Sequence, residues 1–71
     1  MVTICVFRKD DGKAVKDAKV RVLFGWADYV DGVTNKEGEV DLNCKPCEGR
    51  IEIDGKEVYK GEISGRKAVY K

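Results

Sequence analysis

Two cysteines, Cys44 and Cys47, are separated by only two residues, and this spacing can bring their thiols together. Such a pair can form a local disulfide, act as a redox couple or supply half of a zinc site. A thioredoxin-type redox site needs its first cysteine at a helix N-terminus, which lowers the pKa of the thiol. Here the pair lies between two expected strands, so that activation is missing. The simplest interpretation is that Cys44 and Cys47 tighten a loop, as thiols or as a local disulfide.

Zinc binding by Cys44 and Cys47 is the main alternative, although structural zinc normally needs four ligands. The chain contains no histidine and only one further cysteine, Cys5. Cys5 could be the third thiolate of a site that a carboxylate completes, or two chains could share one zinc ion through Cys44 and Cys47 of each. Otherwise Cys5 is expected to behave as a small buried hydrophobic residue. We therefore expect no cofactor, with zinc as the alternative.

Two aromatic residues, Trp26 and Tyr29, follow the second expected strand and are the candidate binding residues. Exposed aromatic side chains at the rim of a β-sandwich can stack on sugars or anchor a partner protein. The competing interpretation is that they cover the end of a small core. The partner expected from these residues is a protein or a carbohydrate.

The sequence offers no catalytic residue. The absence of histidine removes the usual general base, and Ser64 has no base beside it in the sequence pattern. With 14 basic and 13 acidic residues the net charge is +1, which does not indicate a nucleic-acid or anionic-membrane surface. No stretch approaches the roughly 20 apolar residues of a membrane span. The expected class is a non-enzymatic binding or interaction module, with a metal- or redox-linked protein as the alternative.

Short segments of alternating apolar residues, separated by glycine turns, are the elements that must position these side chains. With 71 residues the chain predicts a single domain, residues 1–71. Hairpins are expected at residues 35–38 and at Asp54-Gly55, and a bulge at Gly61. Residues 26–31 are the least predictable segment. The expected strands are residues 2–8, 18–24, 32–34, 39–42, 50–53, 57–63 and 67–70, and residues 44–49 are expected to form a tight loop.

Alternation within these strands also predicts the core. Residues 2, 4 and 6 share one face of the first strand, and its other face is apolar as well. The side chains expected between two sheets are Val20, Val22, Val40, Leu42, Ile51 and Ile53. Lysine-rich strands and Gly61 are typical of guarded sheet edges, so we expect a monomer or a weak homodimer.

Two blocks of the sequence resemble the carboxypeptidase regulatory-like family. The first block fits the family pattern D-G-x-P-V-x-G-A-x-V, with Ala14 in place of proline and Asp17 in place of glycine. In the second block, residues 34–38, Asn35 replaces the aspartate of the family pattern T-D-x-x-G. The resemblance implies a seven-stranded antiparallel β-sandwich of transthyretin-like (prealbumin-like) type. It also implies an accessory role, since family members are usually extracellular modules of larger proteins.

The compartment expected for the chain depends on its start. The N-terminal residues are apolar but lack a basic leader and a small-residue cleavage site. If Met1 is the native start, we expect a cytoplasmic protein. If the chain is an excised domain, we expect an extracellular one.

Overall fold

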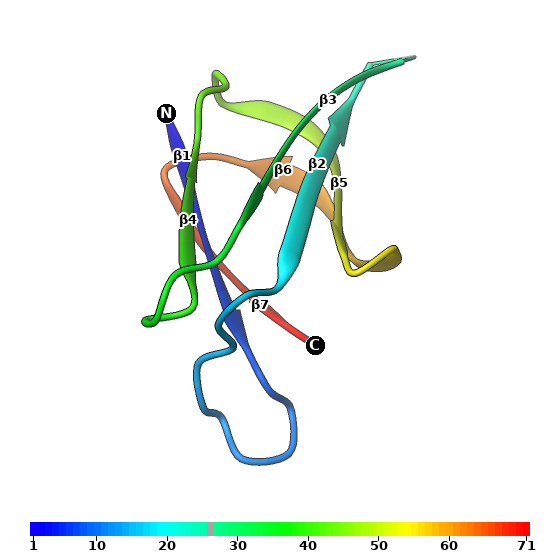
Figure 1. Ribbon diagram of the computed structural model, residues 1–71. Coiled ribbons are helices and arrows are strands. Elements are labelled where there is room, and N and C mark those ends of the chain that lie inside the picture. Colours follow the sequence, from blue (N-terminus) through cyan, green and yellow to red (C-terminus); the bar gives the residue numbers. More distant parts are fainter. Residues whose placement is uncertain (26) are drawn as a thin grey trace.

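The computed structural model describes residues 1–25 and 27–71. The described residues form seven strands and no helix, arranged as two facing sheets (Figure 1). The prediction of an all-β, sandwich-like domain is therefore confirmed. No helix in the described part of the chain could span a membrane. The strands are β1 (Val2–Phe7), β2 (Lys19–Phe24), β3 (Asp28–Val33), β4 (Glu39–Leu42), β5 (Cys47–Ile53), β6 (Lys56–Ile63) and β7 (Arg66–Tyr70).

The strand order is β4-β1-β7 in the three-stranded sheet and β3-β2-β5-β6 in the four-stranded sheet. The expectation of purely antiparallel pairing is wrong, because β7 pairs with β1 in parallel. The physical reason lies in the turn before β7. The Thr3 amide donates to the Gly65 carbonyl at 2.8 Å, which places the start of β7 beside the start of β1. Because the two strands begin side by side and pair along their length, β7 runs in the same direction as β1.

The turn at residues 35–38 forms, but the hairpin predicted around it does not. β3 belongs to the four-stranded sheet and β4 to the three-stranded sheet, so the turn carries the chain from one sheet to the other. Gly38 directs this crossing, since its carbonyl accepts from the Val6 amide of β1 at 2.7 Å. The strand expected at residues 32–34 begins earlier, because residues 28–31 of the least predictable segment also belong to β3, an edge strand of the four-stranded sheet.

The β5–β6 hairpin at Asp54-Gly55 is confirmed. Both residues have positive φ angles, 52° and 87°, as a two-residue type I′ turn requires. The bulge predicted at Gly61 is wrong in position, because the register shift between β5 and β6 lies closer to the turn than Gly61 does. Ile51 pairs with Tyr59 and Glu52 with Glu57, which leaves Val58 as the extra residue.

The core lies between the two sheets and follows the predicted alternation closely. Five of the six residues expected there are buried, namely Val20, Val22, Leu42, Ile51 and Ile53. Val40 is only partly buried, although it packs against the core. Its strand lies at an edge, and it faces Gly32 of β3, which has no side chain to cover it.

Candidate functional site

The Cys44–Cys47 segment links the two sheets. Cys44 follows β4 and donates its amide to the Leu42 carbonyl at 2.9 Å, while Cys47 is the first residue of β5. The predicted loop of residues 44–49 is therefore shorter than expected. Both thiols are free and half-buried, and both side chains pack against the core.

The environment of Cys44 favours the neutral thiol. Burial raises the pKa of the Cys44 thiol, and the neighbouring Cys47 thiol raises it further. Since the thiolate is the nucleophile in disulfide exchange, this shift is opposite to the one that activates a redox catalyst.

Cys5 is buried elsewhere, on the face of β1 that points away from the core. Its neighbours across the sheet are Glu39 and Ala68, and Arg66 forms an ion pair with Glu39 on the same face. Burial raises the pKa of the Cys5 thiol, and the positive charge of Arg66 opposes that shift. The structure thus does not bring Cys5 together with Cys44 and Cys47. Within the described ranges, no three histidine, cysteine or acidic residues are grouped to hold a metal ion.

Tyr29 lies on the outer face of the four-stranded sheet, and 53% of its surface is exposed. The Arg21 guanidinium carbon stands over its ring, 4.6 Å from the ring centre. Arg21 Nη2 also lies 3.8 Å from Asp31 Oδ2 on the same strand as Tyr29. Arg21 therefore holds the tyrosine ring against the sheet through a cation–π contact. The sequence singled out Tyr29, but it did not reveal Arg21, because this contact depends on the register between β2 and β3.

The other aromatic candidate, Trp26, lies outside the described residues. We call the outer-face group Arg21, Tyr29, Asp31 and Val33 the β3 surface. Val33 is 56% exposed and so extends the apolar part of this surface along the strand.

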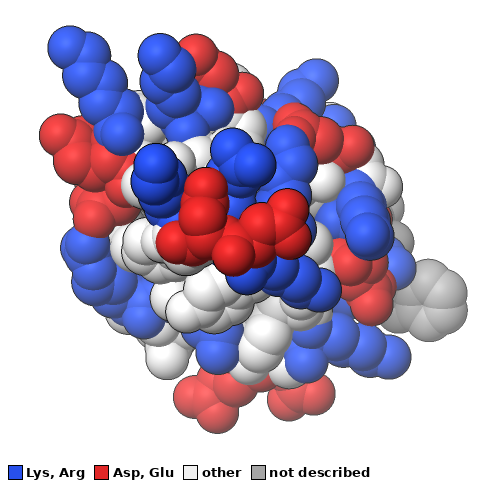
Figure 2. Space-filling view, turned by 90° about the horizontal axis from the view of Figure 1, so that it is seen from below, with Lys and Arg blue, Asp and Glu red and all other residues white. Residues whose placement is uncertain are grey.

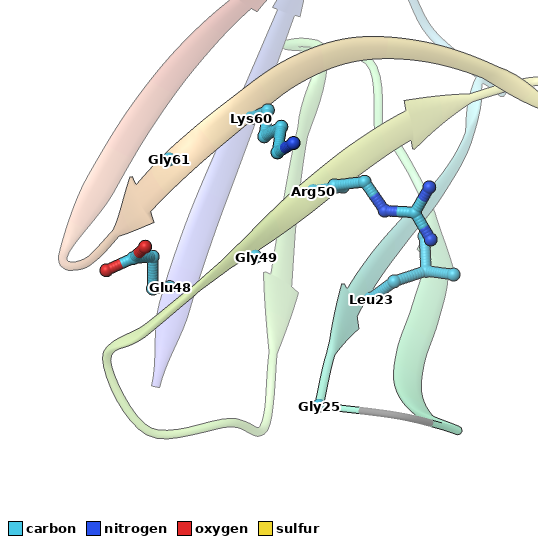
Figure 3. A pocket seen from close by; sticks show the side chains of 7 residues that line it. All are labelled: Leu23, Gly25, Glu48, Gly49, Arg50, Lys60 and Gly61. Atoms are coloured by element: carbon cyan, nitrogen blue, oxygen red, sulfur yellow. The ribbon is translucent and has the colours of Figure 1, made fainter.

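A shallow hollow of about 640 Å³ lies on the four-stranded sheet, at the end of β2 and beside the middle of β5 and β6 (Figure 3). Two glycines that are register partners, Gly49 and Gly61, belong to its lining. Arg50 and Lys60 line it together with Glu48, and Arg50 Nη1 is 3.6 Å from Glu57 Oε1. Figure 3 shows the Arg50 side chain extending from β5 toward Leu23 of β2. The hollow combines charges of both signs.

The end of the molecule that carries the β1–β2 loop also mixes its charges. Figure 2 shows lysine and arginine side chains interspersed with aspartate and glutamate on this face. A nucleic-acid surface would instead show a continuous basic region that follows the phosphate backbone.

The chain matches no family model, no curated protein and no solved structure.

Proposed function

We propose that this chain is a non-enzymatic interaction module that contacts a partner protein through the β3 surface. The observation that carries the proposal is the exposed Tyr29 ring, which the Arg21 guanidinium holds in place at 4.6 Å. Tyrosine and arginine are, with tryptophan, the residue types most enriched at the energetic centres of protein interfaces. Because Arg21 already restricts the tyrosine ring, the ring loses little conformational entropy on binding, and a smaller part of the contact free energy is spent on ordering it.

The proposal extends to the fold, which we assign to the transthyretin-like type of β-sandwich. Seven strands divided three and four between two sheets are compatible with it. Asp17 adds support, because its φ angle of 58° lies in the left-handed region, at the position where the resembling family has glycine. Gly38 of the second block has a φ angle of 74°, which explains why that position needs glycine.

Photo-crosslinking tests the proposed function. A benzoylphenylalanine at position 29 should give a discrete protein adduct in a lysate of the source organism. The matched control is the same group at position 70, since Tyr70 is 51% exposed but belongs to the three-stranded sheet. Adducts at both positions, or at neither, would count against the β3 surface as the contact site. If the chain binds a glycan on a glycan panel and Tyr29→Ala loses that binding, the partner of the β3 surface is a carbohydrate and not a protein.

The two-residue spacing of Cys44 and Cys47, which are both free and both packed against the core, supports a second candidate, a zinc ion shared between two chains through both thiols of each. Thiolate ligands would link such a site to assembly and to pH. Sedimentation with and without zinc tests this candidate. A dimer that forms on adding zinc, and disappears with chelator or in the Cys44→Ser/Cys47→Ser variant, would support it. Unchanged sedimentation would exclude it.

A further inference from the structure

We infer that the free edge of β3 binds an extended segment of the partner protein, with a basic residue opposite Asp31 and an apolar residue opposite Tyr29. The segment would add a fifth strand to the four-stranded sheet. This inference rests on the proposed function and names the class of partner that the β3 surface recognises.

The free edge follows from the hydrogen-bond pattern of β3. The Thr34 amide donates to the Ala18 carbonyl of the neighbouring chain segment at 3.0 Å. Along an antiparallel strand the backbone groups point alternately toward and away from the neighbour. Residues 32, 30 and 28 therefore direct their amide and carbonyl groups at β2. The corresponding groups of Tyr29, Asp31 and Val33 point outward, where the described part of the chain offers no other backbone partner.

The other three sheet edges in the described structure are less suited to pairing. Folded proteins protect sheet edges with basic side chains, bulges and short strands. The β6 edge has Lys56, Lys60 and the bulge at Val58, and the β7 edge has Arg66 and Lys67. β4 is only four residues long. β3 has six residues, no lysine or arginine, and two exposed apolar side chains.

The chemistry of the partner can be inferred from β2, which already pairs with β3 on its other side. Across that pairing Leu23 faces Tyr29 and Arg21 faces Asp31. An added strand would face the same side chains of β3, because directly opposed residues of an antiparallel pair share one face of the sheet. The only charged residues of β3 are Asp28 and Asp31, and the Asp31 side chain stays 44% exposed beside Arg21. A basic residue opposite Asp31 is therefore complementary.

A second copy of the chain fits this edge poorly. In the antiparallel register centred on Asp31, the two Asp31 side chains of the copies would face each other, and directly opposed like charges destabilise a sheet. In the register centred on Val30, Tyr29 of one copy would face Asp31 of the other. Val33 would lie opposite Ala27, which is outside β3. The charge and length of β3 thus favour a different, basic segment over self-pairing.

Titration with a short peptide tests the inference. The probe is the capped hexapeptide KTRTLT, which keeps the outer-face residues of β2 and replaces the alternate ones with threonine. We expect it to shift the backbone amide resonances of residues 28–33 and to slow hydrogen exchange at Tyr29, Asp31 and Val33. The control peptide KTETLT should bind about tenfold more weakly, because it places a second carboxylate opposite Asp31.

A variant with the opposite charge at position 31 tests whether Asp31 determines the preference between the two peptides. Asp31→Lys should reverse the preference between the two peptides, provided that its dispersed amide spectrum shows a folded domain. Asp31→Asn provides a second variant, in which the two peptides should bind equally. Equal binding of both peptides to the wild-type chain would overturn the inference.

The remaining outcomes separate the inference from the proposed function. A protein adduct at position 29 without any peptide effect on β3 would leave the proposed function intact and refute the added strand. No adduct and no peptide effect would refute both. A wild-type dimer that Tyr29→Lys dissociates would assign the edge to a second copy of the chain and overturn the inference.

Discussion

The Thr34 hydroxyl donates a hydrogen bond to the Val15 carbonyl at 2.7 Å and so fixes the segment that leads into β2. The same oxygen accepts from the Ala18 amide at 2.9 Å, and Thr34 is the only buried polar residue among those described. One side chain therefore connects the two sequence blocks that carry the family resemblance.

Replacing Thr34 with valine should destabilise the domain by about 2 kcal/mol, because it leaves the Val15 carbonyl and the Ala18 amide without a partner. Urea unfolding of both chains gives the difference. Thr34→Ser, which keeps the hydroxyl, is the control and should cost clearly less. A loss for serine that equals or exceeds the loss for valine would contradict the prediction, because serine keeps the hydroxyl and valine keeps the methyl group.

Asp17→Gly should stabilise the domain by about 0.5 kcal/mol. Asp17 has a φ angle of 58°, a conformation that glycine adopts without steric cost. The gain is modest because glycine is also more flexible in the unfolded chain. Lys16→Gly serves as the control for that flexibility and should be destabilising. A lower urea midpoint for Asp17→Gly would contradict the prediction.

Gly49→Ala should destabilise the domain by about 3 kcal/mol, since overpacking against atoms that cannot move is costly. A Cβ atom at position 49 would lie 2.2 Å from the backbone carbonyl oxygen of Leu23. Gly12→Ala is the matched control, because no heavy atom lies within 4 Å of its Cβ position and only the φ angle of 72° is unfavourable. Its expected cost is about 1 kcal/mol. Similar unfolding free energies for the two variants would be evidence against the close approach at Gly49.

The buried thiols should make the domain less stable at alkaline pH. Burial raises the pKa of both Cys5 and Cys44 in the folded chain. The contribution of the two thiols to the free energy of unfolding is fully present below the pKa of an unfolded thiol, about 8.5. It is lost as the pH rises through the higher pKa that the thiols have in the folded chain. Urea unfolding under reducing conditions should therefore show a falling free energy above about pH 8.5. Cys5→Ala/Cys44→Ala should flatten this dependence, and an unchanged slope would contradict the assignment.

The sequence predicted those parts of the fold that alternation determines. Residues 2, 4 and 6 of β1 are buried, buried residues alternate in β2 and at the end of β5, and the sequence Asp54-Gly55 favours a type I′ turn. The first part of β3, residues 28–31, escaped prediction because an edge strand buries few side chains, and Asp28 and Asp31 do not favour strands. The sequence of the turn at residues 35–38 does not distinguish a hairpin from a crossing between sheets, because the same turn can join strands that pair and strands that separate. Gly61 resembled a bulge but serves as the partner of Gly49.

The candidate site could be predicted only in part. Tyr29 stood out as an aromatic residue in an unassigned segment, and the cysteine pair stood out by its spacing. The Arg21 contact and the burial of Cys5 away from the other thiols depend on strand register and on which face of β1 meets the core. Neither property is visible until the strands are placed in their sheets.

The parallel pairing of β1 with β7 determines how the domain would bear tension applied to its two ends. A force on residues 1 and 71 pulls the two strands past each other, and it loads all of the hydrogen bonds between them at once. A force on residues 1 and 43 would instead separate the antiparallel β1 and β4 one bond at a time, starting from the Val2–Leu42 pair. Single-molecule pulling should therefore show a higher rupture force for the first attachment than for the second. In a longer chain, such a domain would act as a mechanically resistant link.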